Sequence, residues 1–387
     1  MGHRNKILLL YISEHSGHHC VSLAIEKAIR ELDASADILN INGFNYTNPI
    51  LERIVNRTYL GVVQRTPEIW DYLYDNPEVL KKVHKFREII HHHNSGKLKQ
   101  LLDEFRPDVI ACTQAFPCGM IADFKKTFSI DTPLIGVVTD YVAHSYWIFD
   151  TVDYYIVPTD KVRDKIIKSG IDDEKIKTYG LPIDPSFARP CNKIKFAQEQ
   201  GLSLETPTLL IMGGGQGLVP MKKIIGSLFG LGIPLQIVVV TGTNKRLFKS
   251  LAKLKAPPEV KVLTLGYVNY INELMEVADL LITKPGGVTI TEAISKGLPM
   301  VIIDPLPGQE AKNAEFLLNS GLALMAKSVR ELPEVVSSLL LNGGAQCACL
   351  SERCKSFAKA NAARKTAELI LRLSGNCPPA IQSEAQR

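Results

Sequence analysis

One stretch in the second half of the chain combines glycines, acids and an amide at short spacings: ITKPGGVTITEAISKGLPMVIIDPLPGQEAKNA, residues 282–314. Two glycines follow an apolar run and precede a helical pattern, so bare backbone there could approach a phosphate closely. Glu292 comes five residues after the second glycine, where a carboxylate could hold a ribose diol or could merely stabilise the helix through its dipole. Gln309 and Glu310 then offer an amide and an acid that could bind sugar hydroxyls. As a set, these groups outline a nucleotide-sugar site.

A second glycine turn, MGGGQG at residues 212–217, follows another apolar run and precedes a helical pattern. Free backbone amides in such a turn attract a phosphate. A dinucleotide-binding fold would add an Asp or Glu about twenty residues further on, but the next apolar run ends in VVVTGTNKR (238–246), without a carboxylate. The GxxxxGK[ST] pattern of a P-loop is also absent from the sequence. The glycine turn therefore favours a phosphate-bearing ligand other than a nicotinamide dinucleotide. The missing GxxxxGK[ST] pattern excludes a P-loop.

A series of apolar runs without alternation of apolar and polar residues would position these turns. Such runs are typical of strands buried on both faces of a parallel sheet that helices cover. They span residues 6–12, 36–41, 107–114, 133–140 and 154–160 in the first half, and 208–215, 235–242, 260–266, 280–287 and 299–305 in the second. Helical patterns between them predict an α/β protein with two doubly wound, Rossmann-like domains facing a cleft. Ligands of such sheets bind at the carboxyl ends of the strands, where both glycine turns lie.

The length of 387 residues is typical of two domains. We predict a first domain over residues 1–184, a second over 185–345, and a terminal helix with a tail over 346–387. The join lies in YGLPIDPSFARP (179–190), which contains three prolines and no periodic pattern. The helical pattern at residues 351–373 could continue the second domain or return to the first.

The composition is that of an ordinary globular protein, with 45% hydrophobic and 22% charged residues and a formal net charge of +5. The apolar runs are strand-sized and the first residues lack the features of a signal peptide, so we expect a protein of the cytosol. Eight scattered cysteines suit that reducing compartment. Cys347, Cys349 and Cys354 lack further paired metal ligands, and we interpret them as small residues in a late loop. Neither half is basic enough to predict nucleic-acid binding.

Three blocks of sequence resemble glycosyltransferase family 28, especially the bacterial processive diacylglycerol glucosyltransferases and the plant monogalactosyldiacylglycerol synthases. The blocks are SGHHCVSLAIEKAI (16–29), TDYVAHSYWIFDTVDYYIVPTD (139–160) and ITKPGG through AEFL (282–317), and the resemblance covers residues 6–330. It implies a GT-B fold, a UDP-hexose donor, inversion at the anomeric carbon, no cofactor and no essential metal. The chain agrees in lacking an Asp-x-Asp pair at a strand end. Amides, helix dipoles and Lys284 would then offset the charge of the diphosphate.

The resemblance also assigns the residues of the donor site. The two glycine turns would lie near the diphosphate, and Glu292 would hold the ribose hydroxyls. Gln309 with Glu310 would hold the hexose, and the turn at residues 266–268 would take the uracil, mostly through its backbone. The complete predicted donor set is Gly214, Gly215, Val268, Lys284, Gly286, Gly287, Val288, Thr289, Glu292, Gln309 and Glu310.

Inverting transfer needs a base that takes the proton of the acceptor hydroxyl. His18 follows the first apolar run and Gly17, at the entrance to the first helix. The positive end of that helix would lower the pKa of the imidazole and keep it neutral, as a base must be. Together with the family resemblance, this position makes His18 the predicted base. Asp140, placed at the end of the fifth strand of the domain, is the rival base or the group that orients the glycerol. Gly17, His144 and Trp147 are the predicted acceptor-site residues.

The sequence departs from the family pattern just before this histidine. The family often has two glycines there, whereas Ser16 and Gly17 stand in this chain. We expect the loop to be slightly less open, with serine still small enough to fit.

Residues from about 45 to 102 depart from a compact strand–helix unit and are predicted as a membrane-facing insertion of the first domain. Aromatic residues there precede clustered basic ones, which suits an anionic membrane surface; an amphipathic insertion with a solvated basic face is the alternative. The residues are Tyr59, Trp70, Tyr72 and Tyr74, then Lys81, Lys82, Lys85, Arg87, Lys97 and Lys99. His91–His93 are interpreted as solvated. We expect a peripheral protein on the cytoplasmic face of the membrane.

The leading hypothesis is transfer of a hexose from UDP-glucose or UDP-galactose to the 3-hydroxyl of 1,2-diacylglycerol, which makes a β-glycosyl diacylglycerol. The nearest alternative is a UDP-GlcNAc transferase that acts on a polyprenyl-linked cell-wall precursor. The insertion and the block at 139–160 argue against it. A UDP-sugar 2-epimerase would leave the insertion unexplained, and a non-catalytic UDP-sugar-binding subunit would have no need of His18 and Asp140. The residues do not separate glucose from galactose, and they set neither the number of sugars added nor the oligomeric state.

Overall fold

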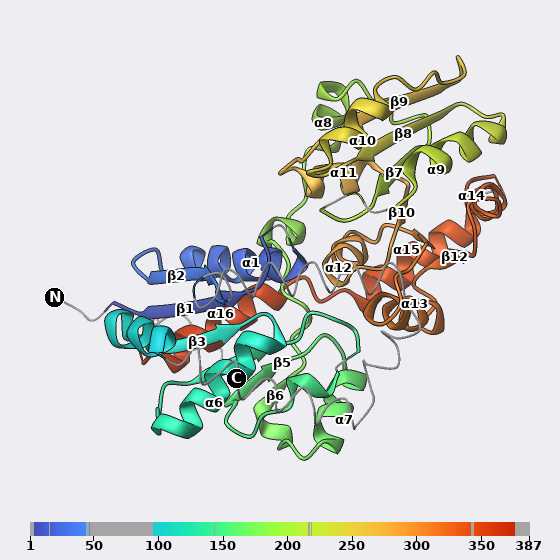
Figure 1. The fold of residues 1–387 in the computed structure, drawn as a ribbon. Helices are drawn as coiled ribbons and strands as arrows, with labels where there is room; N and C mark the ends of the chain where they lie inside the picture. Colours follow the sequence, from blue (N-terminus) through green and yellow to red (C-terminus); the bar gives the residue numbers. More distant parts are fainter. Residues whose placement is uncertain are drawn as a thin grey trace. The chain divides into compact units, whose positions relative to one another are not determined.

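The computed structural model describes residues 4–14, 16–43, 46, 96–142, 144–215, 217, 219–341 and 344–375. The chain divides into two compact units (Figure 1): a first unit of Met1–Pro185 with Lys359–Arg387, and a second unit of Ser186–Ala358. Of the predicted insertion, only Tyr46 and the helical residues 96–102 are described. The other named residues of that prediction lie outside the described residues: Tyr59, Trp70, Tyr72, Tyr74, Lys81, Lys82, Lys85, Arg87 and His91–His93. Within the described ranges, no helix combines the length and apolar character that crossing a bilayer requires.

The first unit contains a six-stranded parallel sheet in the order β2-β1-β3-β4-β5-β6. Its strands are β1 Lys6–Tyr11, β2 Asp37–Asn42, β3 Val109–Cys112, β4 Leu134–Val137, β5 Tyr154–Ile156 and β6 Ile176–Lys177. Its main helices are α1 Gly17–Leu32, α6 Ala115–Phe128, α7 Asp160–Lys168 and α16 Ala362–Leu373. All residues of β3 and β4 are buried, which is why these runs show no alternation in the sequence.

The second unit repeats this architecture with a parallel sheet in the order β12-β11-β10-β7-β8-β9. Its strands are β7 Thr208–Met212, β8 Leu235–Val240, β9 Val260–Leu265, β10 Leu280–Thr283, β11 Met300–Ile303 and β12 Leu324–Ala326. Its main helices are α8 Lys193–Glu199, α9 Met221–Leu228, α10 Lys245–Leu251, α11 Ile271–Val277, α12 Gly287–Lys296, α13 Gln309–Asn319, α14 Leu332–Leu340 and α15 Ala345–Phe357.

Each sheet has one point where the order of its strands reverses direction. In the first unit, β1 pairs with β2 on one side and with β3 on the other. In the second, β7 pairs with β8 on one side and with β10 on the other. Loops that leave neighbouring strands at such a point run apart and leave a crevice at their carboxyl ends, where ligands of open α/β sheets bind. The crevice positions follow β1 and β3 in the first unit, and β7 and β10 in the second.

The terminal helical pattern differs from the prediction of one helix over residues 351–373. Two helices, α15 and α16, occupy this region, and the chain between them is not helical. Helix α16 belongs to the first unit and packs beside α1 (Figure 1). Just after it, Ser374 Oγ donates to Asn5 Oδ1 at 2.8 Å. Cys347, Cys349 and Cys354 lie in helix α15, so their assignment to a loop was wrong.

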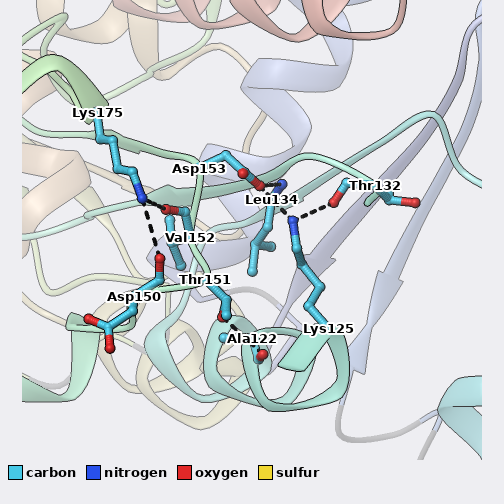
Figure 2. Close-up of polar contacts among 9 residues, drawn as sticks. All are labelled: Ala122, Lys125, Thr132, Leu134, Asp150, Thr151, Val152, Asp153 and Lys175. Atoms are coloured by element: carbon cyan, nitrogen blue, oxygen red, sulfur yellow. Dashed lines mark hydrogen bonds and ion pairs between the residues drawn. The ribbon is translucent and has the colours of Figure 1, made fainter. Parts of the chain in front are cut away.

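A buried lysine ties together the amino-terminal ends of β4 and β5 (Figure 2). Lys125 Nζ donates to Asp153 Oδ2 at 2.6 Å and to the Thr132 carbonyl at 2.7 Å. The same carboxylate oxygen accepts from the Leu134 amide at 2.7 Å, at the first residue of β4. The Lys125 side chain is only 9% exposed. Asp153 therefore compensates a desolvated charge and also fixes the start of a central strand.

Asp153→Ala is expected to destabilise the first unit by about 2 kcal/mol, because it leaves the Lys125 ammonium buried with one carbonyl partner and removes the acceptor of the Leu134 amide. Urea unfolding measures the loss. Asp173→Ala is the matched control, since it removes an exposed pair with Arg163, and its effect should be much smaller. Equal midpoints for the two variants would show that the Lys125 contacts add nothing beyond a surface pair.

Candidate active site

His18 lies at the strand reversal of the first unit. Helix α1 begins directly after the turn that leaves β1, with Ser16 as its N-cap. Ser16 Oγ accepts from the His19 amide at 3.3 Å and donates to the Ile12 carbonyl at 2.8 Å. The serine that stands in place of a glycine thus stabilises the start of the helix that carries the histidine. Gly17 is the first residue of that helix and is exposed.

The imidazole of His18 contacts two groups of neighbouring strand ends. Nδ1 lies 3.0 Å from the Thr113 carbonyl oxygen, just after β3, and 3.0 Å from Thr139 Oγ1, just after β4. The residue retains some accessible surface, but burial of the ring lowers the pKa of His18 to about 4, against the opposing effect of the hydrogen bond to Thr113. The direction agrees with the sequence-based expectation, whereas the main cause is burial rather than the helix dipole. His18 is therefore neutral at pH 7.

The other predicted residues of the first unit lie after β4. Asp140 directly follows Thr139 and is half-buried. It comes after the fourth strand in chain order, so its assignment to a fifth strand was wrong. His144 is 8% exposed, and its ring meets those of Tyr146 and Trp147 at centroid distances of 5.3 and 6.4 Å. Trp147 belongs to the hydrophobic core of the unit. Packing in the core is enough to explain the buried position of Trp147. The acceptor-site roles of His144 and Trp147 stay predictions.

In the second unit, the glycine turn that contains Gly214 and Gly215 is a tight loop at the carboxyl end of β7. The Gly217 amide donates to the Gly214 carbonyl at 3.0 Å, and both glycines have positive φ, 59° and 71°. The Gly215 carbonyl accepts from the Thr243 amide at 2.9 Å and from Thr243 Oγ1 at 3.1 Å. A Cβ on Gly242 would collide with that carbonyl. A Cβ on Gly217 would also lie only 2.8 Å from the Thr241 carbonyl oxygen. The loop is therefore held in place by the end of β8, and Gly217 and Gly242 combine positive φ with a backbone contact too close for a side chain.

Lys284, in the KPGG turn, contacts both of the other segments predicted to bind the donor, the turn at Gly214 and the PGQE segment that contains Glu310. Its Nζ pairs with Glu310 Oε1 at 2.6 Å, and the two side chains are 13% and 16% exposed. The second oxygen of Glu310 accepts from the Leu306 amide at 3.0 Å. The Lys284 stem passes Gly214, where an added Cβ would lie 3.1 Å from Cε. The sequence-based interpretation gave the lysine to the diphosphate and the acid to the hexose separately; the structure shows them as a pair without net charge.

Two helix N-termini lie beside this pair, at the carboxyl ends of β10 and β11. Gly286 caps α12 and Gly308 caps α13, and neither end has a side-chain cap. Asn313, which is fully buried, donates through Nδ2 to the Pro285 carbonyl at 3.1 Å and so fixes one turn against the other. Uncapped amides at a helix N-terminus attract anions. The arrangement suits a diphosphate.

The remaining predicted donor residues lie on or near these helices. Gly287, Val288 and Thr289 form the first turn of α12, and Glu292 is in its second turn, half-buried. Gln309 is the first residue of α13. Val268 follows β9, an edge strand that is separated from β7 by β8. The fold thus puts every predicted donor residue on the side of one sheet where the strands have their carboxyl ends.

Several contact residues escaped the sequence-based prediction: Thr113, Thr139, Thr243 and Asn313. Thr113 and Thr139 lie inside the apolar runs at residues 107–114 and 133–140, where a threonine indicates only a strand.

A cavity of ≈ 620 Å³ in the second unit is not part of this site, because Pro207, Asp279 and Pro299 in its lining precede β7, β10 and β11 at the opposite edge of the sheet. In the part of the chain that the structure describes, no three His, Cys, Asp or Glu side chains gather as a metal site would require; the donor's independence of metal stays a prediction.

Comparison with known proteins gives matches to both units. Residues 18–183 match the family model described as monogalactosyldiacylglycerol (MGDG) synthase, and residues 208–370 match the glycosyltransferase family 28 C-terminal domain. The chain is 31% identical over 340 residues to the processive diacylglycerol beta-glucosyltransferase of Bacillus pumilus, covering 88% of each protein. Among solved structures, Acinetobacter baumannii MurG has a TM-score of 0.61 at 16% identity, with 95% of this chain and 99% of that chain covered. A UDP-N-acetylglucosamine 2-epimerase has a TM-score of 0.59 at 14% identity, with 97% and 98% covered. The structural matches show the GT-B fold alone.

Proposed function

Because the chain belongs to glycosyltransferase family 28, with the processive diacylglycerol β-glucosyltransferases and monogalactosyldiacylglycerol synthases, we propose that it transfers one hexose at a time to diacylglycerol. The donor is UDP-glucose or UDP-galactose, the acceptor atom is the 3-hydroxyl of 1,2-diacylglycerol, and the product is a β-glycosyl diacylglycerol. The observation that carries this proposal is the match to a diacylglycerol glucosyltransferase over 88% of both chains. Such a match spans the acceptor-binding half as well as the donor-binding half.

His18 acts as the base of this reaction. Its neutral imidazole takes the hydroxyl proton while that oxygen attacks the anomeric carbon from the face opposite the diphosphate. The bond between the anomeric carbon and the phosphate oxygen breaks, and its electron pair leaves with UDP. The sugar configuration is therefore inverted, and the proton ends on His18 before it passes to solvent. The burial that lowers the pKa of His18 supports this role, because it keeps the base form populated at neutral pH. Asp140 orients the glycerol.

The donor-binding unit supplies the charge complement for UDP. Backbone amides at the starts of α12 and α13 and in the turn at Gly214 and Gly215 face developing negative charge on the leaving diphosphate. Lys284 moves from full pairing with Glu310 to shared pairing with phosphate, and Glu310 with Gln309 holds hexose hydroxyls. Glu292 holds the ribose diol. No metal or cofactor takes part.

The acceptor stays in the bilayer, so the enzyme works as a peripheral protein on the cytoplasmic face of an anionic membrane. Support for this part of the proposal comes from the aromatic and basic composition of the insertion from about 45 to 102. The alternatives, a polyprenyl-linked cell-wall acceptor and UDP-sugar epimerisation, are distinguished by the products they form.

Liposomes that contain diacylglycerol, incubated with the protein and separately with UDP-glucose, UDP-galactose or UDP-GlcNAc, are expected to yield a hexosyl diacylglycerol with one of the first two donors. Mass spectrometry identifies the lipid, and glycosidase digestion identifies the β linkage. Added EDTA should leave the yield unchanged, because amides rather than a cation offset the diphosphate charge. Formation of an epimerised UDP-sugar without any glycolipid would overturn the proposal, and so would transfer only to a polyprenyl-linked acceptor.

A further inference from the structure

The surroundings of His18 determine which of its ring nitrogens carries the proton. The Thr113 carbonyl oxygen and Thr139 Oγ1 both lie 3.0 Å from Nδ1. A main-chain carbonyl accepts hydrogen bonds and cannot donate one. Without a proton on Nδ1, two lone pairs would face each other in a buried place, where an unmade hydrogen bond costs most. The neutral ring has a single proton, so Nε2 is left as its only proton acceptor.

We propose that Thr113 and Thr139 hold His18 in the Nδ1–H tautomer and thereby make Nε2 the atom that takes the proton of the acceptor hydroxyl. The inference rests on the proposed function for the identity of that hydroxyl. Thr113 and Thr139 are positioning residues, since both act through the imidazole. Thr113 contributes its main-chain carbonyl to the ring and also donates its hydroxyl to the His18 carbonyl at 2.8 Å, which fixes the backbone of the same residue. Thr139 supplies a second acceptor for the shared proton.

The same contacts serve both protonation states of the base. After proton transfer both ring nitrogens are donors, and Nδ1–H retains the partners that it had before. The ring therefore does not turn between the neutral and charged states. Both partners are uncharged dipoles, so the hydrogen bond to Thr113 opposes the effect of burial on the pKa of His18 without adding the attraction of a carboxylate charge. This agrees with a His18 pKa that burial holds at about 4.

Rigid elements fix the two threonines. Thr113 is fully buried, Thr139 is 5% exposed, and the Thr113 amide donates to the Leu10 carbonyl of β1 at 3.0 Å. They follow β3 and β4, which are consecutive in the sheet beside β1. The tautomer is thus set by the pairing of three parallel strands, at the point where the strand order reverses.

Nitrogen NMR of wild-type protein labelled with ¹⁵N-histidine tests the tautomer directly, and it does not depend on turnover. The signals of His18 are assigned by their loss in His18→Gln. At neutral pH we expect a protonated Nδ1 and an unprotonated Nε2. A protonated Nε2, or rapid exchange between the two tautomers, would overturn the inference. If the protein formed no glycolipid while Nδ1 proved protonated, the proposed function would fail and the tautomer assignment would stand.

Kinetics of three threonine variants test the positioning role. Thr139→Val keeps the side-chain shape and removes the hydroxyl, and kcat is expected to fall about three- to tenfold, the usual effect of one neutral hydrogen bond, with KM for the UDP-sugar unchanged. Thr139→Ser should restore kcat. Thr127→Val, on the exposed surface of α6, is the control and should match wild type. Equal losses in Thr139→Val and Thr139→Ser, or wild-type kcat in Thr139→Val, would contradict the role of the hydroxyl.

Discussion

His18→Ala is expected to lower kcat for glycolipid formation by about 10²- to 10⁴-fold, the usual contribution of a positioned general base. The affinity for UDP should stay close to the wild-type value, because every predicted donor group lies in the second unit whereas His18 lies in the first. Initial rates on diacylglycerol liposomes measure the first quantity, and titration calorimetry with UDP measures the second. A change in both would point to misfolding of the protein rather than to loss of the base.

The neighbouring imidazole provides the matched control. His19 stacks on Tyr11 with ring centroids 4.2 Å apart and an interplanar angle of 18°. His19→Ala removes an imidazole from the same helix turn, and kcat should remain near that of wild type. Wild-type turnover in His18→Ala would remove His18 from the mechanism and assign the base to Asp140, for which Asp140→Asn would then show the large loss.

The pH profile provides a second readout of the same prediction. The base is the neutral form of His18, and burial lowers its pKa to about 4 in the folded protein. Protonation therefore removes the base only as the pH falls toward 4, so kcat/KM should stay level from neutral pH down to about pH 5. An acid limb near 6.5, the ordinary value for histidine, would show that the ring is solvated in the working enzyme.

The sequence predicts the strands well where burial is complete. Runs such as LQIVVV become β8 with all six residues buried, because a strand covered on both faces leaves an unambiguous apolar signal. Strands β6 and β12 contain only two and three residues, and the sequence analysis does not predict them. The break between α15 and α16 has no glycine or proline to mark it. Packing of α16 against α1 decides it, and tertiary contacts of that kind override local propensity.

Some residues of the site can likewise be predicted from the local sequence, whereas others are revealed only by contacts between distant parts of the chain. Glycine turns and helix starts are local, so the residues of KPGG and MGGGQG are enough by themselves to indicate a phosphate. The contacts of Thr113 and Thr139 with His18 span 95 and 121 residues of sequence. The pairing of Lys284 with Glu310 depends on two adjacent strand ends in the same way. Threonine and lysine at strand ends are too common to signal a site, and only the strand order reveals their partners.

Glu292→Gln is expected to raise the Kd for UDP at least about tenfold, because a hydrogen bond to a charged group contributes about 1.5–3 kcal/mol and a ribose diol can make two of them. The alternative role of Glu292 is stabilisation of α12 through its dipole. That effect falls off within the first turn of a helix, whereas Glu292 lies in the second. Its position therefore favours a ligand over the dipole, and the variant should bind UDP weakly while its Tm stays near that of wild type.

Titration calorimetry with UDP and with 2′-deoxy-UDP, both in EDTA, separates the two roles of Glu292. Wild-type protein should bind UDP more tightly than 2′-deoxy-UDP, and Glu292→Gln should no longer discriminate between them, because the missing hydroxyl and the missing charge belong to one contact. Glu334→Gln, in the first turn of α14, is the matched control and should retain both affinities. A lower Tm with unchanged discrimination would assign Glu292 to the helix alone. Absence of any UDP binding by the wild-type protein would rule out a nucleotide-sugar donor. The uncapped helix ends and glycine turns of the second unit would then bind some other anion.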